Sequence, residues 1–489
     1  MNLYALVLAV IVLTLLTVSL TRLNKVKTKA DYLVAGRSLS AFVLVFTLLS
    51  SWIGSGSLLA GAENAYRHGF AALWQPAGGW LGLLLIYFIA PRARKFAQYT
   101  IPDLLETRYN QAARVLGVIA ILLAYTAVTS YQFIGGGDIL HLIFPTVVTP
   151  ILGRYIIAAF VIVLTAIAGM SSVAYMDLFI GLLATTALTI ALPVLIHITG
   201  GWSVIRTDLP ATHFQVFGDL TPIQALELFL PTCLLLLGNQ SMYQKFFSAK
   251  TERAASRAVV GWIVGTVILE SVIVALAVAG SALFPTGEVA QAPREILAYI
   301  GLHGFGDTPS TITPASTYAM HLLGALLIGA IFAKVISTAN NWLFSPATNL
   351  VNDIYVRYIS PTASNKRILI VSRLTVVLLG IWSLYQGLYA QSVLKKALYA
   401  YTIYGAALTP VILAAFFWRR ATAAGAVTSI AAGTAITVVW DTLHTHLSPA
   451  LANRDAIIPA LATSLLCLFV VSLLTPPPDL AHLQPICEA

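Results

Sequence analysis

The chain has few charged residues. Asp, Glu, Lys and Arg together make up 10% of its 489 residues, whereas a soluble globular domain carries about 25%. Hydrophobic residues make up 58%, and the mean hydropathy is +0.85. The apolar runs are about 20 residues long and lack the ten-residue apolar/polar alternation of a porin-type barrel. The composition therefore predicts an all-α polytopic membrane protein and excludes both a soluble domain and such a barrel.

Cysteine is also scarce. Cys233, Cys467 and Cys487 show neither the spacing of a disulfide framework nor that of a metal site, so we interpret them as inert residues. The apolar runs contain no Ser/His/Asp arrangement and no pair of histidines at metal-ligand spacing. We therefore expect no enzymatic activity and no organic cofactor. The net charge of +9 is explained by membrane topology, and we expect no nucleic-acid partner.

Thirteen apolar runs are predicted to span the bilayer within a single transporter domain, 1–489. They are 2–21, 40–66, 72–91, 113–137, 152–170, 174–198, 224–246, 256–284, 318–345, 367–389, 396–418, 424–442 and 456–475. Lys and Arg number 20 in the loops of one predicted side and 7 in those of the other. By the positive-inside rule, we expect a cell-membrane protein with its N-terminus outside and its C-terminus in the cytoplasm.

The run 40–66 contains a small, polar and glycine-rich centre at 48–59, with the sequence LLSSWIGSGSLL. Glycine costs about 1 kcal/mol relative to alanine in a helix interior. Backbone that leaves helical geometry at membrane depth is tolerated only beside a cavity or a protein partner. Free carbonyls next to hydroxyls are hard oxygen ligands, which suit an alkali cation. The alternative is a small-residue patch for close helix packing, and the residues alone leave both interpretations open.

A second run is interrupted in the same way, by Gly238, Asn239 and Gln240 within 235–244. If 2–21 is set aside as a peripheral helix, 40–198 and 224–418 each contain five spans, and each set begins with an interrupted helix. This arrangement is typical of an inverted repeat with its binding site between the two breaks. Two further peripheral helices follow at 424–475, and 476–489 forms a tail.

The run 318–345 carries polar residues at the depth of the membrane. Ser337, Thr338, Asn340 and Asn341 lie within about one helical turn, and such side chains avoid lipid by facing a partner or a cavity. One interpretation is hydrogen bonding between helices. The other is that their hydroxyls complete an oxygen cage opposite the first interrupted helix.

Three of the charged residues within the apolar runs are candidates for function: Asp177, Glu270 and Lys334. Asp177 is predicted near the start of a long helix. It is either an acid that the helix dipole favours at that position or part of a functional site. Glu270 is in mid-span, as a functional acid or as a neutral group in a packing contact. Lys334 costs about 2.5–3.5 kcal/mol at the helix centre. Its ammonium either reaches the membrane interface or lies near the ion cage, where it replaces or tunes a sodium ion.

Aromatic residues gather near the two breaks: Trp52, Trp74, Trp80, Tyr131 and Tyr243. Their faces suit a cationic or ring-bearing solute, although aromatic residues also anchor spans at the membrane interface. Trp52, inside the first break, is the one that we assign to a site.

These features together resemble the sodium:solute symporter family over about residues 30–420. The matching segments are 31–37 (DYLVAGR), the Ser-Trp-Ile-Gly break at 51–54, Ala65-Tyr66 with Gly69, 99–103 (YTIPD), 175–177 (YMD), 238–240 (GNQ), Gln244-Lys245, Ala249-Lys250, Ser337-Thr338 and 353–355 (DIY).

The resemblance implies a LeuT-type core of five plus five helices, with one extra helix before it and two after it. It also implies solute uptake by alternating access, driven by inward sodium. Carried over by position, the sodium ligands are the carbonyls of Ser50, Ile53 and Lys334 and the hydroxyls of Ser337 and Thr338. Asp177 matches an acid that supports this site.

Two departures from the family's pattern accompany these matches. Asn340 and Asn341 stand where serines complete a second sodium site in some members, and Lys334 stands where the family usually has a small residue. The solute contacts that the resemblance implies are Trp52, Ser55, Ser57, Trp80, Tyr131, Asn239 and Tyr243.

The leading hypothesis is therefore a sodium-coupled symporter of a small organic solute in a lipid bilayer. One alternative is a sodium-independent or proton-coupled carrier of the same fold, in which Lys334 replaces the ion or Glu270 titrates. Another is a transporter-like membrane sensor.

Overall fold

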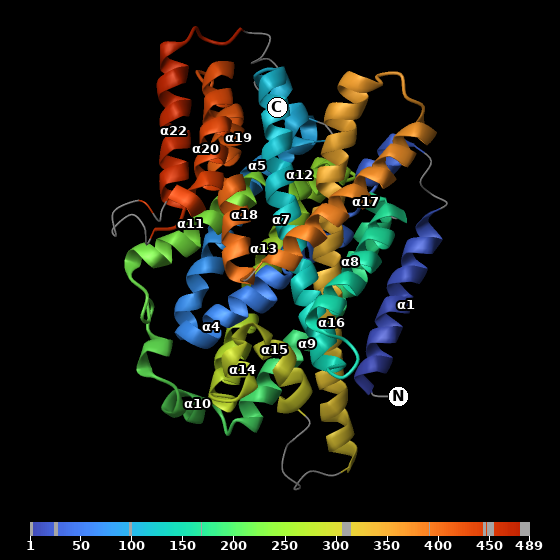
Figure 1. Cartoon of the computed structure of the whole chain (residues 1–489), viewed down its shortest axis with the longest axis vertical. Coiled ribbons are helices and arrows are strands. Elements are labelled where there is room, and N and C mark those ends of the chain that lie inside the picture. The colour runs from blue at the N-terminus through green and yellow to red at the C-terminus, as the bar shows by residue number, and fades with distance from the viewer. Residues whose placement is uncertain are drawn as a thin grey trace.

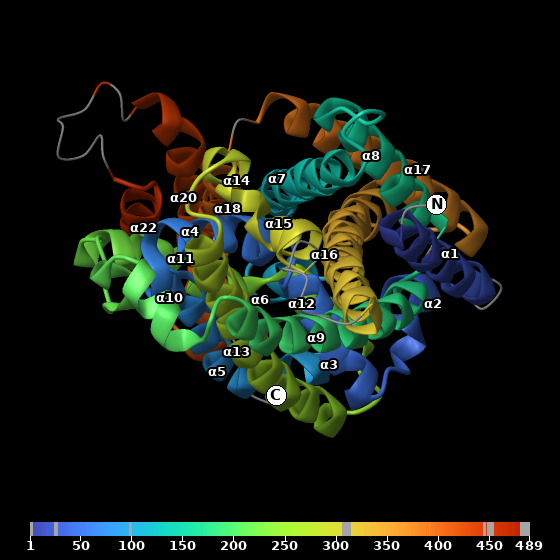
Figure 2. The same cartoon turned by 90° about the horizontal axis from the view of Figure 1, so that it is seen from below.

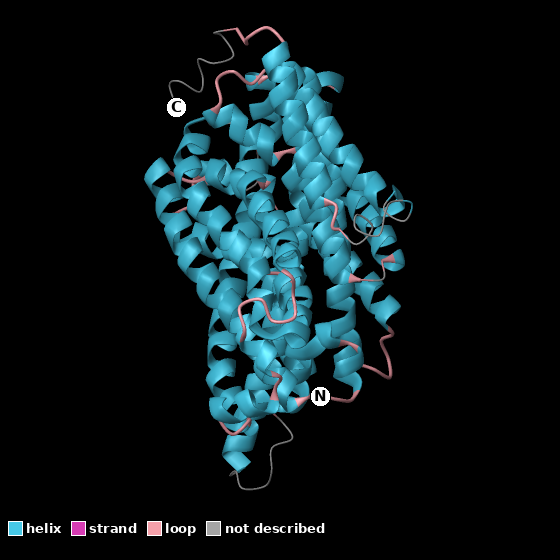
Figure 3. Ribbon diagram, turned by 90° about the vertical axis from the view of Figure 1, so that its left-hand side faces the viewer, coloured by secondary structure: helices cyan, strands magenta, loops and turns pink. Residues whose placement is uncertain are grey.

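Helices make up almost all of the described part of the chain (Figures 1 and 3). The computed structural model describes residues 3–23, 28–96, 100–167, 169–305, 314–390, 392–443, 446 and 454–479. Residue 2 of the first predicted span, Cys487 and residues 480–489 of the predicted tail lie outside these ranges. Within them, the only strand-like pairing is one isolated bridge.

The membrane-spanning helices agree with the predicted fold class. Among the described residues, twelve helices are long and apolar enough to cross a bilayer, and Ala41–Trp52 is a shorter apolar helix. The segment Gly56–Ala90, counted among these twelve, is interrupted at Gly69, which has φ 63° and ψ −141° and lies between the two spans that the sequence predicts there. The principal helices are α1 (Leu3–Leu23), α3 (Ala41–Trp52), α4 (Ala62–His68), α5 (Trp74–Phe96), α7 (Gln111–Ile143), α8 (Pro150–Ile167), α9 (Met170–Ile198), α11 (Pro222–Gly238), α12 (Gln240–Ser248), α13 (Glu252–Leu283), α16 (Pro314–Asn349), α17 (Asn365–Tyr389), α18 (Val393–Ala407), α19 (Thr409–Phe417), α20 (Ala423–Leu443) and α22 (Ile457–Leu474).

Short helices connect these spans: α2 (Lys29–Val34), α6 (Ile101–Arg108), α10 (Trp202–Asp208), α14 (Glu288–Gln291) and α15 (Ile296–Tyr299). In Figure 1, α10, α14 and α15 lie in the lower part of the molecule, level with the lower portion of α16. Between α5 and α7, α6 begins at Ile101 after the cap residue Thr100, with Pro102 in its first turn.

Side-chain caps fix where several spans begin. Ser40, Asn110, Thr251 and Ser392 precede α3, α7, α13 and α18, and each accepts a hydrogen bond from the backbone N–H three residues later. Because the first N–H groups of a helix have no partner within the helix, these side chains stabilise each start.

The core of the bundle is formed by α7, α16 and α18, with α9, α3 and α13 packed alongside (Figure 2). Helix α1 lies at one edge, against α16, α9 and α8, while α20 and α22 pack together against α18 on the opposite side. The extra N-terminal helix and the two extra C-terminal helices are thus peripheral, and the two interrupted helices lie inside.

The isolated bridge joins the two interrupted helices. Leu39, just before α3, pairs in parallel with Ala249, just after α12. Its N–H donates to the carbonyl of Ser248 at 3.1 Å, and its carbonyl accepts from the N–H of Lys250 at 2.9 Å. The entry to the first interrupted helix is therefore tied to the exit from the second.

Candidate functional site

The first predicted break is confirmed. Helix α3 ends at Trp52, and Ile53 has φ −83° and ψ 100°, outside helical geometry. The chain then resumes as a π-helical turn, Gly56–Gly61, that leads into α4. Gly54 faces α16 so closely that a Cβ atom on it would lie 2.5 Å from Thr338 Oγ1. Glycine is therefore required here for the broken helix to reach α16.

The break and α16 bring four of the predicted ion ligands together. Thr338 Oγ1 donates to the carbonyl of Ser50 at 3.0 Å and lies 3.4 Å from that of Ile53. Ser337 Oγ also lies 3.4 Å from the carbonyl of Ser50. All four residues are buried. Two carbonyls at the break, one from the last turn of α3 and one from Ile53, and two hydroxyls therefore form one cluster of oxygen atoms.

Asp177 supports this cluster from α9. Its carboxylate accepts hydrogen bonds from Ser337 Oγ, from Thr47 Oγ1 on α3, and from Asn341 Nδ2 at 3.1 Å. Its own carbonyl accepts from Ser50 Oγ at 3.0 Å. The acid thus ties α3 and α16 to α9 around the cluster.

Lys334 lies beside the same oxygen cluster. Its side chain is fully buried, and Nζ is 3.3 Å from Ser50 Oγ. The interpretation that it reaches the membrane interface is therefore wrong. The ammonium points into the break.

A second buried lysine lies nearby, and sequence reasoning missed it. Lys245 Nζ on α12 donates to Ser241 Oγ at 3.0 Å and to Asn341 Oδ1 at 2.8 Å. Lys245 is one of the 20 Lys and Arg residues that the positive-inside count assigns to loops. Its spacing of four residues from Ser241, on the helix that follows a break, was the available signal.

The second predicted break is also confirmed. Asn239, with φ −65° and ψ 109°, separates α11 from α12. Its Oδ1 accepts from Tyr125 Oη at 2.8 Å and from the N–H of Met242 at 3.2 Å. Tyr243 Oη donates to the carbonyl of Leu237 at 3.0 Å. Asn239 and Tyr243 therefore hold the second break in place.

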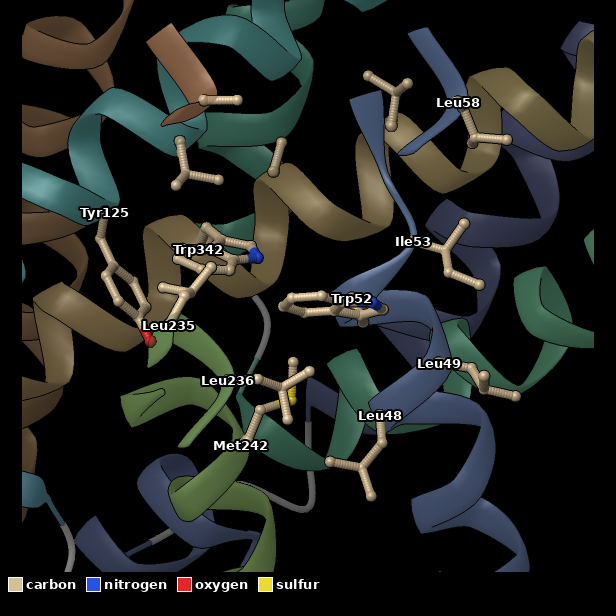
Figure 4. Packing of buried hydrophobic residues seen from close by; sticks show 14 of the residues in the cluster. Leu48, Leu49, Trp52, Ile53, Leu58, Tyr125, Leu235, Leu236, Met242 and Trp342 are labelled. Atoms are coloured by element: carbon tan, nitrogen blue, oxygen red, sulfur yellow. The ribbon is translucent and has the colours of Figure 1, made fainter. Parts of the chain in front are cut away.

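Apolar packing fills the space between the two breaks. Figure 4 shows Trp52 and Trp342 on one side of this core and Leu236 and Met242 on the other. Trp342 also donates from Nε1 to the carbonyl of Ser51 at 2.9 Å, which satisfies another free carbonyl of the first break. The core thus fixes the position of the indole of Trp52.

A small cavity adjoins Trp52. Its volume is about 20 Å³, which is near the space that a single water molecule needs. Its lining residues are Trp52, Ser57, Gly61, Ala72, Gln75, Pro76, Thr232, Glu270, Ile273, Val274 and Tyr401. In this conformation the cavity is too small to hold an organic solute.

Glu270 is the centre of this cavity's polar contacts. Its Oε1 accepts from Trp52 Nε1 at 2.9 Å and from Ser57 Oγ at 3.2 Å, and its Oε2 accepts from Trp80 Nε1 at 2.9 Å. The side chain is 4% exposed. Three residues predicted to contact solute therefore meet at one carboxylate, which the sequence left without a partner.

The other predicted contacts do not touch Glu270 through a hydrogen bond that the structure shows. The N–H of Ser55 donates to Gln132 Oε1 at 2.9 Å. Tyr131 Oη lies 3.2 Å from the Oη of Tyr401, a cavity residue. Neither Asn239 nor Tyr243 lines the cavity. The structure thus groups Trp52, Ser57 and Trp80 around Glu270. Tyr131 contacts Tyr401, which lines the cavity, and does not line it itself.

Comparison with known proteins gives one family over most of the chain. A family model described as "Sodium:solute symporter family" matches residues 32–433. The high-affinity proline transporter PutP of Bacillus subtilis is 27% identical over 475 residues, which cover 92% of this chain and 94% of that protein. A sodium/proline symporter of Staphylococcus aureus is 25% identical, covering 96% of this chain and 92% of that protein.

Two solved structures share the fold. A Na⁺-coupled sialic acid symporter in a substrate-bound outward-open state has a TM-score of 0.77, with 98% of this chain and 99% of that chain covered at 17% identity. Mhp1, a nucleobase-cation-symport-1 family transporter in a closed conformation, has a TM-score of 0.58 at 12% identity, covering 95% of this chain and 100% of that chain.

Proposed function

Because the chain belongs to the sodium:solute symporter family, we propose that it imports a small organic solute together with sodium by alternating access. The solute crosses the membrane chemically unchanged, with no enzymatic step. The protein lies in the cell membrane as a multi-pass protein, with its N-terminus outside and its C-terminus in the cytoplasm. The excess of Lys and Arg in the loops of one side supports this orientation.

The observation that carries the proposal is the oxygen cluster between α3 and α16. The carbonyls of Ser50 and Ile53 lie within 3.4 Å of Thr338 Oγ1. When sodium binds, the hydroxyls of Ser337 and Thr338 turn their lone pairs towards the ion, and the carbonyl of Lys334 adds a further oxygen. Hard oxygen ligands of this kind suit an alkali cation.

The same helix connects the ion to the solute. Ser50 and Ile53 belong to the break that places Trp52 at the cavity wall. An ion that holds the break against α16 therefore also fixes one wall of the solute site. By linkage, the solute must tighten sodium binding by the factor by which sodium tightens solute binding.

The test compares the thermal unfolding midpoint of the purified protein in sodium and in potassium. We expect sodium alone to raise the midpoint of the wild type. A ligand at 100 times its Kd contributes about 2.7 kcal/mol. Thr338→Val keeps the shape and removes the hydroxyl, so its response to sodium should be lost.

Thr437→Val is the matched control, because Thr437 is buried in α20 and bonds only to the carbonyl of Gly433 in its own helix. It should respond to sodium as the wild type does. Equal wild-type midpoints in the two salts would contradict the proposal. The sodium-independent alternative is not favoured, because two of the similar proteins are named for sodium coupling.

A further inference from the structure

The cavity beside Trp52 contains one charged residue, Glu270. The other lining residues are neutral and mostly apolar or aromatic. Among the residues that the structure describes, no Lys, Arg or His forms an ion pair with Glu270. An acid that is 4% exposed, lies in mid-span and lacks a cationic partner is costly to keep charged.

The hydrogen bonds of Glu270 nevertheless suit a carboxylate. Trp52 and Trp80 place an indole N–H at 2.9 Å, one on each carboxylate oxygen. An indole N–H can only donate, so neither group can accept the proton of a neutral acid. Ser57 adds a third donor at 3.2 Å. These contacts favour the negative form without neutralising its charge.

The aromatic and apolar side chains around Glu270 also favour a positively charged ligand. Trp52 and Tyr401 line the same cavity, with Pro76, Ile273 and Val274 as apolar walls. Aromatic faces attract organic cations. The indole of Trp52 packs closely against α5, since a Cβ atom on Gly79 would lie 3.1 Å from its Cζ2.

We propose that the solute is an organic cation whose positively charged nitrogen pairs with Glu270. The inference rests on the proposed function and names its substrate class. The cavity provides no basic side chain for a carboxylate, so it matches a net cation better than a zwitterion or an anion. At about 20 Å³, the cavity must widen for such a solute to enter.

The test measures thermal midpoints in sodium with a panel of solutes. Choline, tetramethylammonium and putrescine are the cationic probes. Proline and glycine betaine are the zwitterions, glucose is the neutral probe and pantothenate is the anion. We expect a concentration-dependent rise from at least one cation. The inference is overturned if no cation stabilises the protein, or if only a zwitterion, neutral or anionic probe does.

Glu270→Gln tests the role of the charge, because it keeps the size of the side chain and an acceptor oxygen. We expect it to weaken binding of the active cation by roughly 30-fold or more, which is the effect of removing one partner of a buried, hydrogen-bonded charge pair. Glu227→Gln is the control, because Glu227 is also a buried glutamate but lies on α11, outside the cavity. Unchanged cation affinity in Glu270→Gln would overturn the inference.

The response to sodium distinguishes a wrong substrate class from a wrong proposed function. If sodium stabilises both the wild type and Glu270→Gln but no cation binds, the substrate class is wrong and sodium coupling stands. If sodium stabilises neither, the proposed function fails. A retained response to sodium also shows that Glu270→Gln is folded.

Discussion

Lys334→Met tests how the buried ammonium acts on the proposed ion site. Lys334 is fully buried, and its Nζ lies 3.3 Å from Ser50 Oγ. The carbonyl of Ser50 belongs to the oxygen cluster that we assign to sodium. Methionine is unbranched and uncharged, so the change removes the charge and keeps most of the volume.

The magnitude follows from the position of the ammonium. An ammonium about 5 Å from a bound sodium ion repels it by roughly 3 kcal/mol at an effective dielectric constant of about 20. Asp177 lies beside the same cluster and offsets part of this repulsion. We therefore expect Lys334→Met to strengthen sodium binding by about 10- to 100-fold.

The assay titrates sodium against purified wild type and Lys334→Met at constant ionic strength, with the thermal midpoint as the readout. The sodium concentration at half-maximal stabilisation should fall by this factor. Lys250→Met is the control, because that side chain is exposed just beyond α12. An unchanged or higher half-maximal concentration in Lys334→Met would refute the reasoning.

Three further changes test other parts of the structure. Gly54→Ala should destabilise the protein by about 1–3 kcal/mol, because the added Cβ would lie 2.5 Å from Thr338 Oγ1. Gly61→Ala is the control and should have little effect on the thermal midpoint, because its Cβ would meet only the carbonyl of Gly56, at 3.5 Å. Asp177→Asn should lower the midpoint and weaken the response to sodium, as seen in the same titration. Burial, and then repulsion by Asp138, raise the pKa of Glu295 from 4.5 to about 7. Between these two pH values the folded protein holds a proton that the unfolded chain releases. The free energy of unfolding should therefore fall as the pH rises from about 4.5 to 7. Glu295→Gln should reduce that fall in midpoints measured across this range, and an identical pH profile would contradict the assignment.

The interrupted helices could be predicted because glycine and polar residues at membrane depth have few physical outcomes. Gly54 and Asn239 lie at the breaks that their sequences predict. Ser337 and Thr338 face the first break because they lie on one side of a single helix. The local sequence was therefore sufficient to predict the two interruptions and the two hydroxyls of the oxygen cluster.

The surroundings of Glu270 could not be predicted in the same way. Its partners come from three other segments, with Trp52 on α3, Ser57 in the π-helical turn and Trp80 on α5. Their meeting depends on the rotation and depth of each helix, which hydropathy does not specify. Lys245 was missed for a related reason, since a lysine near the end of an apolar run is usually a loop charge.

The bridge between Leu39 and Ala249 has a mechanical consequence. Its backbone hydrogen bonds hold only while the two segments keep their separation. A tilt of α3 at that end therefore carries the end of α12 with it. An opening motion that keeps these two bonds therefore holds the start of α3 and the end of α12 together, whatever rotation each helix makes about that point.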